Sequence, residues 1–352
     1  MIDTRPTPHL LVDADVLDAN IAAMAAHADR LGVVLRPHAK THKTPEIARL
    51  QLAAGATGLT VATVAEAEVF ADAGFDDLFL AYPLWVDPAK GERLRALASA
   101  ARLRLGVDSV EGARALAAQA PGTAVLVEVD SGQHRSGVAP DETGVLAEQA
   151  ARAGLDVQGV FTFPGHSYAP GQRETVAAAE ATALRAAVAS LAEHGVEAKV
   201  VSGGSTPSVH AAHADVLTEL RPGVYVFGDA QQWELGTIGP QSVALTCLAT
   251  VVSHAGGRVV LDSGSKALGA DRAPWATGWG RLLDHPDARI VQLSEHHAVV
   301  EWDGSPPPAL GSRVRVVPNH VCNAVNLAAE LVVVRGGAEI DVWAVAARGA
   351  NT

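Results

Sequence analysis

The stretch VVLRPHAKTHKTPEIARLQLAAG, residues 33–55, contains one strand followed by one helix. An apolar, β-branched run ends near residue 39, and a basic cluster follows it. Pro45 stands where proline is favoured, in the first turn of a helix, and the apolar residues after it recur three and four apart up to Gly55. Glycine is common just past a helix end. The stretch therefore predicts a buried strand, a short connection and a helix.

The same alternation recurs along residues 30–230. Alanine-rich segments of helical periodicity separate eight short runs of strand character: VVLRPHA, GLTVAT, DLFLAY, LRLGVD, AVLVEVD, VQGVFTF, AKVVSGG and LRPGVYVF. Strands that are apolar on both faces and separated by helices indicate a parallel sheet. Eight such units close naturally into a (β/α)8 TIM barrel, which we favour over an open sheet.

After residue 235 the pattern changes to alternating apolar and polar residues with glycine and proline between them, as in SVALTCLATVVS and ELVVVRGGAEIDVWAVAA. This pattern indicates an antiparallel β domain. We therefore predict an α/β chain of two domains, a barrel at residues 1–235 and a β domain at residues 236–352. A chain of 352 residues is long enough for one large domain and a smaller one.

The composition narrows the range of partners and compartments. A net charge of −12 argues against binding to nucleic acid or to an anionic membrane, because both select for clustered positive charge. We see no secretory signal at the N-terminus and expect no membrane-spanning stretch, so we expect a cytoplasmic protein. With only Cys247 and Cys322, a disulfide framework is not expected, and Cys247 reads as a core residue.

Lys40 follows the first predicted strand and should lie at the mouth of the barrel, where such barrels carry their catalytic groups. Burial beside other basic groups would favour its neutral amine, the form that condenses with an aldehyde. A solvated basic loop is the alternative. The glycine-rich stretches VSGGSTPS (201–208) and RPGVYVFG (221–228) follow the last two strands, the usual phosphate position, although ordinary turns would have the same composition. Together these features suggest pyridoxal 5'-phosphate.

Other polar groups follow the fifth and sixth strands. EVDSGQHRSGV should project Asp130, His134 and Arg135 toward the barrel mouth, although a surface salt bridge would also explain Arg135. FTFPGHSYAPG should project His166 and Tyr168, for which a structural histidine and a packed aromatic are the alternatives.

The β domain contains an H-x-C pair in VVPNHVCNAVNL. On an extended segment His320 and Cys322 would point to the same face. Imidazole and thiolate suit zinc, and two protein ligands would leave positions for water and substrate. A buried cysteine beside a polar turn is the alternative.

The order of TPHLLVD, RPHAKTHK, EVDSGQHRSGV, GHSY, SGGSTPS, RPGVYVFGDAQ, DSGSKAL and PNHVCN resembles the D-serine dehydratase and D-threonine aldolase family. These are fold-type III pyridoxal phosphate enzymes with an alanine racemase-like fold. The resemblance covers nearly the whole chain. It implies a barrel that carries the cofactor, a β domain that carries a divalent metal (zinc, or alternatively manganese), and a homodimer.

The matching motifs imply roles for individual residues. Lys40 would form the Schiff base, His320 and Cys322 would bind the metal, and Arg135 would reach the cofactor's phenolic oxygen. Tyr168 would lie near the pyridine nitrogen, a position for which Arg221 competes. His38 and His166 are candidates for contact with the substrate. The implied phosphate-binding residues are Gly203, Gly204, Ser205, Thr206, Gly223, Val224 and Tyr225.

The family reading implies a lyase acting on a small D-3-hydroxy amino acid. A dehydratase would convert D-serine or 3-hydroxy-D-aspartate to a 2-oxo acid and ammonia, and we prefer it because Cys322 and GHSY resemble the dehydratase branch. The alternative is a D-threonine aldolase, which would give glycine and an aldehyde. An amino acid racemase is disfavoured because no tyrosine follows Tyr225 to serve as a second base. A non-enzymatic cofactor carrier would leave the β domain unexplained.

Overall fold

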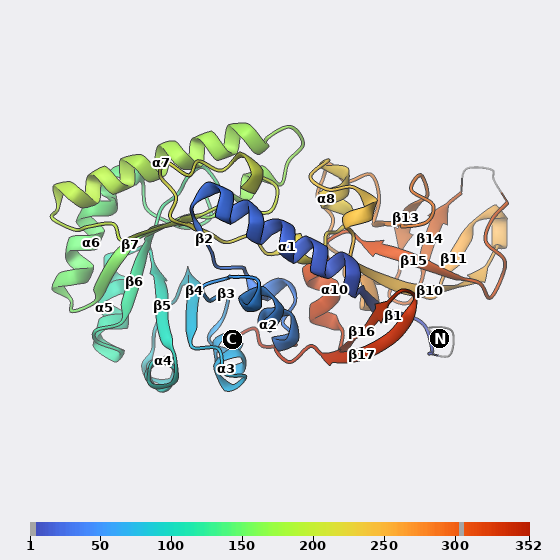
Figure 1. Cartoon of the computed structure of the whole chain (residues 1–352), viewed down its shortest axis with the longest axis horizontal. Coiled ribbons are helices and arrows are strands. Elements are labelled where there is room, and N and C mark those ends of the chain that lie inside the picture. The colour runs from blue at the N-terminus through green and yellow to red at the C-terminus, as the bar shows by residue number, and fades with distance from the viewer. Residues whose placement is uncertain (1–4, 303–305) are drawn as a thin grey trace. The chain divides into compact units, whose positions relative to one another are not determined.

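The computed structural model describes residues 5–302 and 306–352 (Figure 1). The chain forms two compact units. The barrel unit comprises Met24–Lys40, Gln51–Gly223 and Ala350–Thr352, and the β unit comprises Met1–Ala23, Thr41–Leu50 and Val224–Gly349. These units differ from the predicted ranges 1–235 and 236–352, because the N-terminal strand pairs within the C-terminal sheet and residues 41–50 and 224–235 cluster with the C-terminal residues.

The barrel unit contains an eight-stranded parallel sheet, in agreement with the predicted (β/α)8 fold. Its strand order is β2-β9-β8-β7-β6-β5-β4-β3. A parallel bridge between His38 and Thr60 links the end of β2 to β3, and the Thr60 amide donates to the Pro37 carbonyl at 2.9 Å. These contacts complete the ring. The strands are β2 (Val34–Leu35), β3 (Leu59–Val61), β4 (Asp77–Pro83), β5 (Arg102–Val107), β6 (Ala124–Glu128), β7 (Asp156–Phe161), β8 (Val200–Gly203) and β9 (Glu219–Leu220).

Helices cover the outside of this sheet (Figure 1). Local chemistry begins several of them, because Thr63, Asp87 and Ser109 each accept a backbone N–H of the first turn through the side chain. The helices are α3 (Val64–Asp72), α4 (Pro88–Ala100), α5 (Val110–Gln119), α6 (Thr143–Arg152) and α7 (Arg173–Glu193). Inside the ring, Phe79, Leu126 and Phe161 form a fully buried cluster.

Helix α7 is, among the described residues, the one helix long and apolar enough to cross a membrane, with a mean hydropathy of 1.2. The expectation that the chain has no such stretch was therefore wrong. Half of this apolar window is buried, and α7 packs against α6, β7 and β8. Its apolarity is accounted for by the face that it buries against the barrel.

The β unit contains a nine-stranded sheet in the order β11-β14-β13-β12-β15-β10-β1-β16-β17, predominantly antiparallel as predicted. Strand β1 lies between β10, which it pairs antiparallel, and β16, which it pairs parallel. The buried side chains of Leu11, Leu248, Val332 and Val334 join these three strands. The strands are β1 (His9–Asp13), β10 (Leu245–Ser253), β11 (Val259–Leu261), β12 (Gly280–Leu282), β13 (Arg289–Leu293), β14 (Ala298–Glu301), β15 (Arg313–Pro318), β16 (Glu330–Arg335) and β17 (Ala338–Ala344).

The further helices of the described residues have these bounds: α1 (Ala14–Leu31), α2 (Pro45–Ala53), α8 (Ala230–Glu234), α9 (Ser265–Leu268) and α10 (Val321–Leu327). The predicted helix that starts at Pro45 is thus present. Cys247 is fully buried in β10, as expected of a core residue, and burial raises the pKa of its thiol to about 12.

Candidate active site

Lys40 lies in a 3-10 turn, Ala39–Thr41, directly after β2. This is the carboxyl end of the strand, where the sequence placed it. Its Nζ atom is 5.5 Å from the centre of the Phe163 ring, which follows β7. The neighbouring His38 is held by the bridge to Thr60 and by its amide, which donates to the Pro222 carbonyl at 3.0 Å. The lysine is therefore fixed at the rim of the barrel through its own strand.

Phe163 brings three of the predicted site residues together. Besides Lys40, the Arg135 guanidinium carbon lies 5.1 Å from its ring centre, and the Tyr168 ring centre lies 6.5 Å away at a tilt of 47°. Cations within about 6 Å of an aromatic ring centre are attracted by the negative face of the ring. We call Lys40, Arg135, Phe163 and Tyr168 the mouth cluster. The sequence analysis missed Phe163, whose only signal was the second aromatic of FTF at a strand end.

Asp130 organises the loop that presents Arg135. Its carboxylate accepts the backbone N–H groups of Gly132 and His134, at 2.8 and 3.0 Å, and the His134 ring N–H at 2.7 Å. Desolvation raises the pKa of Asp130, but these hydrogen bonds outweigh it and lower the pKa below its usual range. Arg135 itself lies 4.0 Å from Glu128, with 54% of its side chain exposed. The loop is rigid at its base and leaves the guanidinium accessible.

His166 lies beside this loop, in the turn Gly165–Ser167. A Cβ atom at Gly132 would stand 3.2 Å from its Nε2, so the glycine makes room for the ring. Its Nδ1 is buried and has no hydrogen-bond partner among the described residues. Burial lowers the pKa of His166, which favours the neutral imidazole. A neutral histidine with an unused nitrogen suits contact with a ligand.

The loop after β8 has features of an anion site. Ser205 shares hydrogen bonds with the hydroxyls of Ser167, at 2.7 Å, and Ser208, at 2.8 Å. The Thr206 hydroxyl is buried without a hydrogen-bond partner in the described part of the chain. An unsatisfied buried donor is costly, so a phosphate oxygen would fit there. Gly204 has φ +81°. Its N–H was expected to bind phosphate, but it donates instead to the buried Glu180 carboxylate at 2.7 Å.

The remaining predicted phosphate residues fall on both sides of a unit boundary. Gly223 closes the long segment of the barrel unit, three residues after β9. Val224 and Tyr225 open the next segment of the β unit, in a 3-10 turn, and both are buried. Within that turn the Val224 carbonyl accepts the amides of Phe227 and Gly228.

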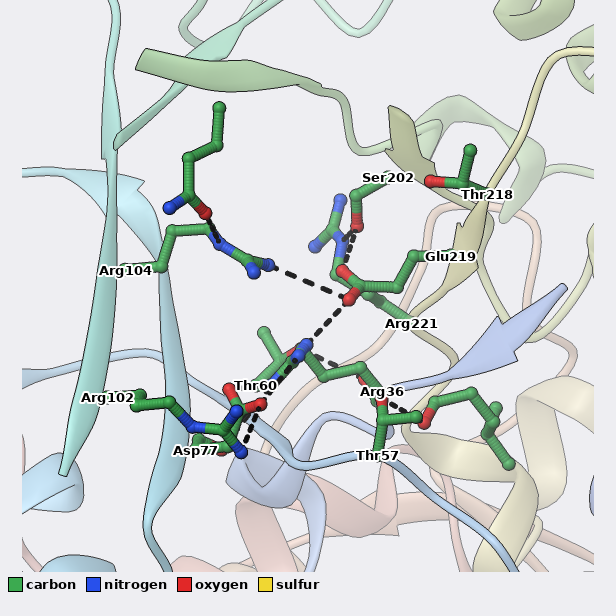
Figure 2. A network of polar contacts seen from close by, with 12 residues as sticks. Arg36, Thr57, Thr60, Asp77, Arg102, Arg104, Ser202, Thr218, Glu219 and Arg221 are labelled. Atoms are coloured by element: carbon green, nitrogen blue, oxygen red, sulfur yellow. Dashed lines mark hydrogen bonds and ion pairs between the residues drawn. The ribbon is translucent and has the colours of Figure 1, made fainter. Parts of the chain in front are cut away.

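Arg221 is committed to the interior of the barrel (Figure 2). Its Nε donates to Ser202 at 2.7 Å and another nitrogen donates to the Thr162 carbonyl. Its guanidinium carbon lies 5.6 Å from the ring centre of Phe79 and 5.3 Å from that of Phe161. Ser202 in turn donates to Glu219 at 2.6 Å. Burial lowers the pKa of Arg221.

The same interior holds a buried ion-pair network. Arg36 contacts Glu219 and Asp77, each at 2.6 Å, and Arg104 lies 3.7 Å from Glu219 (Figure 2). We call Arg36, Asp77, Arg104, Glu219 and Arg221 the interior network. It ties together strands β2, β4, β5 and β9 across the ring.

In the β unit, His320 and Cys322 lie at a corner between β15 and α10. The expected extended segment was wrong, because His320 is the residue before the helix and Cys322 lies in its first turn. Their side chains are nevertheless close enough to interact. The His320 Nδ1 is 3.3 Å from the Asp229 carboxylate, and Cys322 Sγ is 3.4 Å from the Thr41 hydroxyl.

Asp229 is a site residue that the sequence analysis missed. It is fully buried, and its two oxygens accept the amides of Gln232 and Val321. Burial lowers the pKa of His320, but the charges and hydrogen bonds of Cys322 and Asp229 raise it well above its usual value. A carboxylate on Nδ1 leaves Nε2 for a metal, the usual arrangement around metal-binding histidines. The pair fits a divalent metal, although the described residues hold no cluster of three or more His, Cys, Asp or Glu ligands.

Comparisons with known proteins agree with this geometry. Residues 12–231 match the family described as alanine racemase, N-terminal domain, and residues 244–334 match the putative serine dehydratase domain. D-threonine aldolase of Arthrobacter sp is 37% identical over 97% of this chain and 93% of its own length. D-threo-3-hydroxyaspartate dehydratase of Delftia sp. (strain HT23) is 35% identical over 91% of each chain.

A solved structure of a variant of that dehydratase, described as the metal-free form, superposes with a TM-score of 0.89 at 33% identity and covers 97% of each chain. The two matched domains follow one another along the chain in the order that the motifs suggested. This chain therefore belongs to the D-serine dehydratase and D-threonine aldolase family of fold-type III pyridoxal phosphate enzymes, with an alanine racemase-like fold.

Proposed function

We propose that the protein is a pyridoxal phosphate-dependent lyase that acts on small D-3-hydroxy amino acids. The observation that carries this proposal is the mouth cluster, where the amine of Lys40 and the guanidinium of Arg135 lie over one ring, at 5.5 and 5.1 Å. The family relatives named as aldolase and dehydratase support the same reaction class.

The cofactor, when bound, supplies an electron sink for the pair of electrons left when a bond to the substrate's α carbon breaks. Lys40 would hold the cofactor covalently, and its amine, once free, would be the base at the α carbon. Arg135 would be the donor to the cofactor's phenolic oxygen. Tyr168 would be the residue at the pyridine nitrogen, since Arg221 is engaged by Ser202 and Thr162.

Ser205 and Thr206 would hold the phosphate through hydroxyl and backbone donors, with Gly203 and Gly204 allowing the chain to turn. Gly223, Val224 and Tyr225 are proposed to contribute further backbone donors. His166, neutral and with an unused nitrogen, contacts the substrate, and His38 positions Lys40 from two residues away.

A divalent metal is proposed at His320 and Cys322, with Asp229 orienting the imidazole. Thiolate and imidazole favour zinc, while manganese is the alternative. Such an ion lowers the pKa of a bound hydroxyl or water by many units, which is the chemistry that both dehydration and aldol cleavage require. A solved structure described as the metal-free form of a D-threo-3-hydroxyaspartate dehydratase variant supports this proposal.

Between the two lyase reactions we favour dehydration, to a 2-oxo acid and ammonia. Cys322 and the GHSY motif resemble the dehydratase branch, and D-serine and 3-hydroxy-D-aspartate are the candidate substrates. Aldol cleavage of D-threonine to glycine and an aldehyde is the second candidate, because the Arthrobacter relative is named as an aldolase. We also propose a homodimer in the cytoplasm, which size-exclusion chromatography and fractionation of cells will test.

The decisive experiment incubates the loaded enzyme with D-serine, D-threonine and D-threo-3-hydroxyaspartate and assays 2-oxo acid against glycine plus aldehyde. We expect 2-oxo acid from at least one substrate. Glycine with aldehyde alone would replace the dehydratase by the aldolase. No turnover of any of the three, with cofactor and zinc or manganese bound, would overturn the proposed lyase.

A further inference from the structure

Glu180 is a buried carboxylate directly behind the loop after β8. It lies on the inner face of α7 and is 1% exposed, and its Oε1 accepts the N–H of Gly204 at 2.7 Å. A Cβ atom at Gly203 would stand 2.3 Å from the same oxygen. The carboxylate therefore packs against the backbone of the loop without any intervening side chain. Nothing in the reaction proposed above requires an acidic group at this position.

The surroundings of Glu180 offer little to balance a negative charge. The other buried residues of α7 are all apolar except Ser190. Arg221 is the charged group that acts on Glu180, and its guanidinium is held by Ser202 and Thr162. His166 and His210 lie in the short turns that pack on α7. The charges that shift their pKa values belong to groups other than Glu180. Desolvation raises the pKa of Glu180 to about 7, so both of its protonation states are populated near neutral pH.

Resting on the phosphate site proposed above, we infer that Glu180 is a positioning residue for the loop Gly203–Thr206 and takes up a proton when a phosphate group binds there. Two like charges on opposite sides of one buried turn repel, and the neutral acid removes that repulsion. Oε1 accepts the Gly204 N–H in either protonation state, so the loop keeps its conformation while the charge changes.

The inference predicts the sign of a pH dependence. A group whose pKa rises on binding makes the complex most stable at low pH and weakens it as the pH rises through the pKa of the free protein. With a free pKa of about 7 that bound phosphate raises further, affinity falls by up to ~tenfold between pH 6 and pH 8 from this group alone.

The test uses the full-length protein freed of cofactor and pyridoxine 5'-phosphate, which carries the phosphate but no aldehyde to react with Lys40. Titrations at pH 6, 7 and 8 compare wild type with Glu180→Gln, which keeps the acceptor for Gly204 and mimics the neutral acid. The probe's own protonation cancels in this comparison. We expect equal affinity at pH 6 and ~tenfold tighter binding by Glu180→Gln at pH 8.

Glu66→Gln is the matched control, because Glu66 is also buried on a barrel helix and accepts a loop amide, that of Ala62, at 2.7 Å. It should keep the wild-type pH dependence. Glu180→Ala removes the acceptor and should weaken binding at all three pH values. If Glu180→Gln shows the same pH dependence of binding as the wild type, the inference about Glu180 is overturned but the phosphate site stands. If the wild type does not bind the probe at all, the phosphate site and the cofactor proposal are overturned as well.

A second measurement needs no variant. Calorimetric titration of the cofactor-free wild type with sulfate, in buffers of different ionisation enthalpy, reports proton uptake directly, because sulfate has no proton to exchange near neutral pH. Uptake of about half a proton at pH 7 is expected from a group with a pKa of about 7. Sulfate binding without proton uptake would contradict the inference even where Glu180→Gln fails to fold.

Discussion

Arg135 and Arg221 each lie over phenylalanine rings of the same barrel, yet their surroundings are opposite. Arg221 is buried, bound by Ser202 and Thr162 and packed against two rings. Arg135 has 54% of its side chain exposed and its nearest carboxylate 4.0 Å away. A cation whose partners are all protein groups serves the fold, whereas one with unused donors at a strand end is available to a ligand.

The largest expected effect is on activity, at the mouth. Lys40→Ala should lower turnover by at least ~10²–10⁴-fold, because it removes a proton-transfer group as well as the cofactor's attachment. The temperature of thermal unfolding should change little. The absorbance band of the Schiff base, which lies near the visible edge and disappears when borohydride reduces the Schiff base, should be missing. A variant that keeps this band would show that another amine carries the cofactor.

The next effect is on stability, in the interior network. Arg36→Met leaves Glu219 buried without its closest partner and should lower the free energy of unfolding by ~3–5 kcal/mol. Arg102→Met is the control, since this side chain is 76% exposed and its pair with Asp77 should contribute below ~1 kcal/mol. Urea denaturation measures both. Equal losses would mean that burial does not distinguish the two arginines.

Arg135→Ala should lower kcat/KM ~10- to 100-fold while leaving the unfolding midpoint unchanged, because a hydrogen bond from a charged donor contributes ~1.5–3 kcal/mol. Arg114→Ala, a surface change whose arginine contacts Gln149 at 3.4 Å, serves as the control. Steady-state kinetics and urea denaturation of the same samples decide the outcome. A loss of stability with intact kinetics would place Arg135 with the interior network instead.

The smallest effect concerns Phe163. Phe163→Leu should weaken pyridoxal phosphate binding ~2- to 5-fold, since a cation over an aromatic ring at an accessible site contributes ~0.5–1 kcal/mol. Phe163→Tyr keeps the ring and should retain the affinity. Titration of the cofactor-free protein by fluorescence distinguishes the two variants, and equal affinity in all three proteins would remove the ring from the site.

Local patterns predicted the eight barrel strands and the β domain, because apolar periodicity and turn residues act within a few positions of each other. Three-dimensional neighbours were harder to foresee. HLLVD looks like any short strand, and nothing in it indicates pairing with residues more than 230 positions away. The spacing of His320 and Cys322 suggested a pair, although a helix start rather than a strand brings them together. Phe163 and Glu180 contact residues of other elements, which no local pattern encodes.

The position of β1 has a consequence for how the protein is made. The strand is synthesised long before its neighbour β16, which lies more than 300 positions later in the sequence. Leu11 must therefore wait for that whole intervening stretch to be synthesised before Val332 can cover it. Until then a nascent chain carries an unfinished sheet edge, and that edge is a natural target for chaperones.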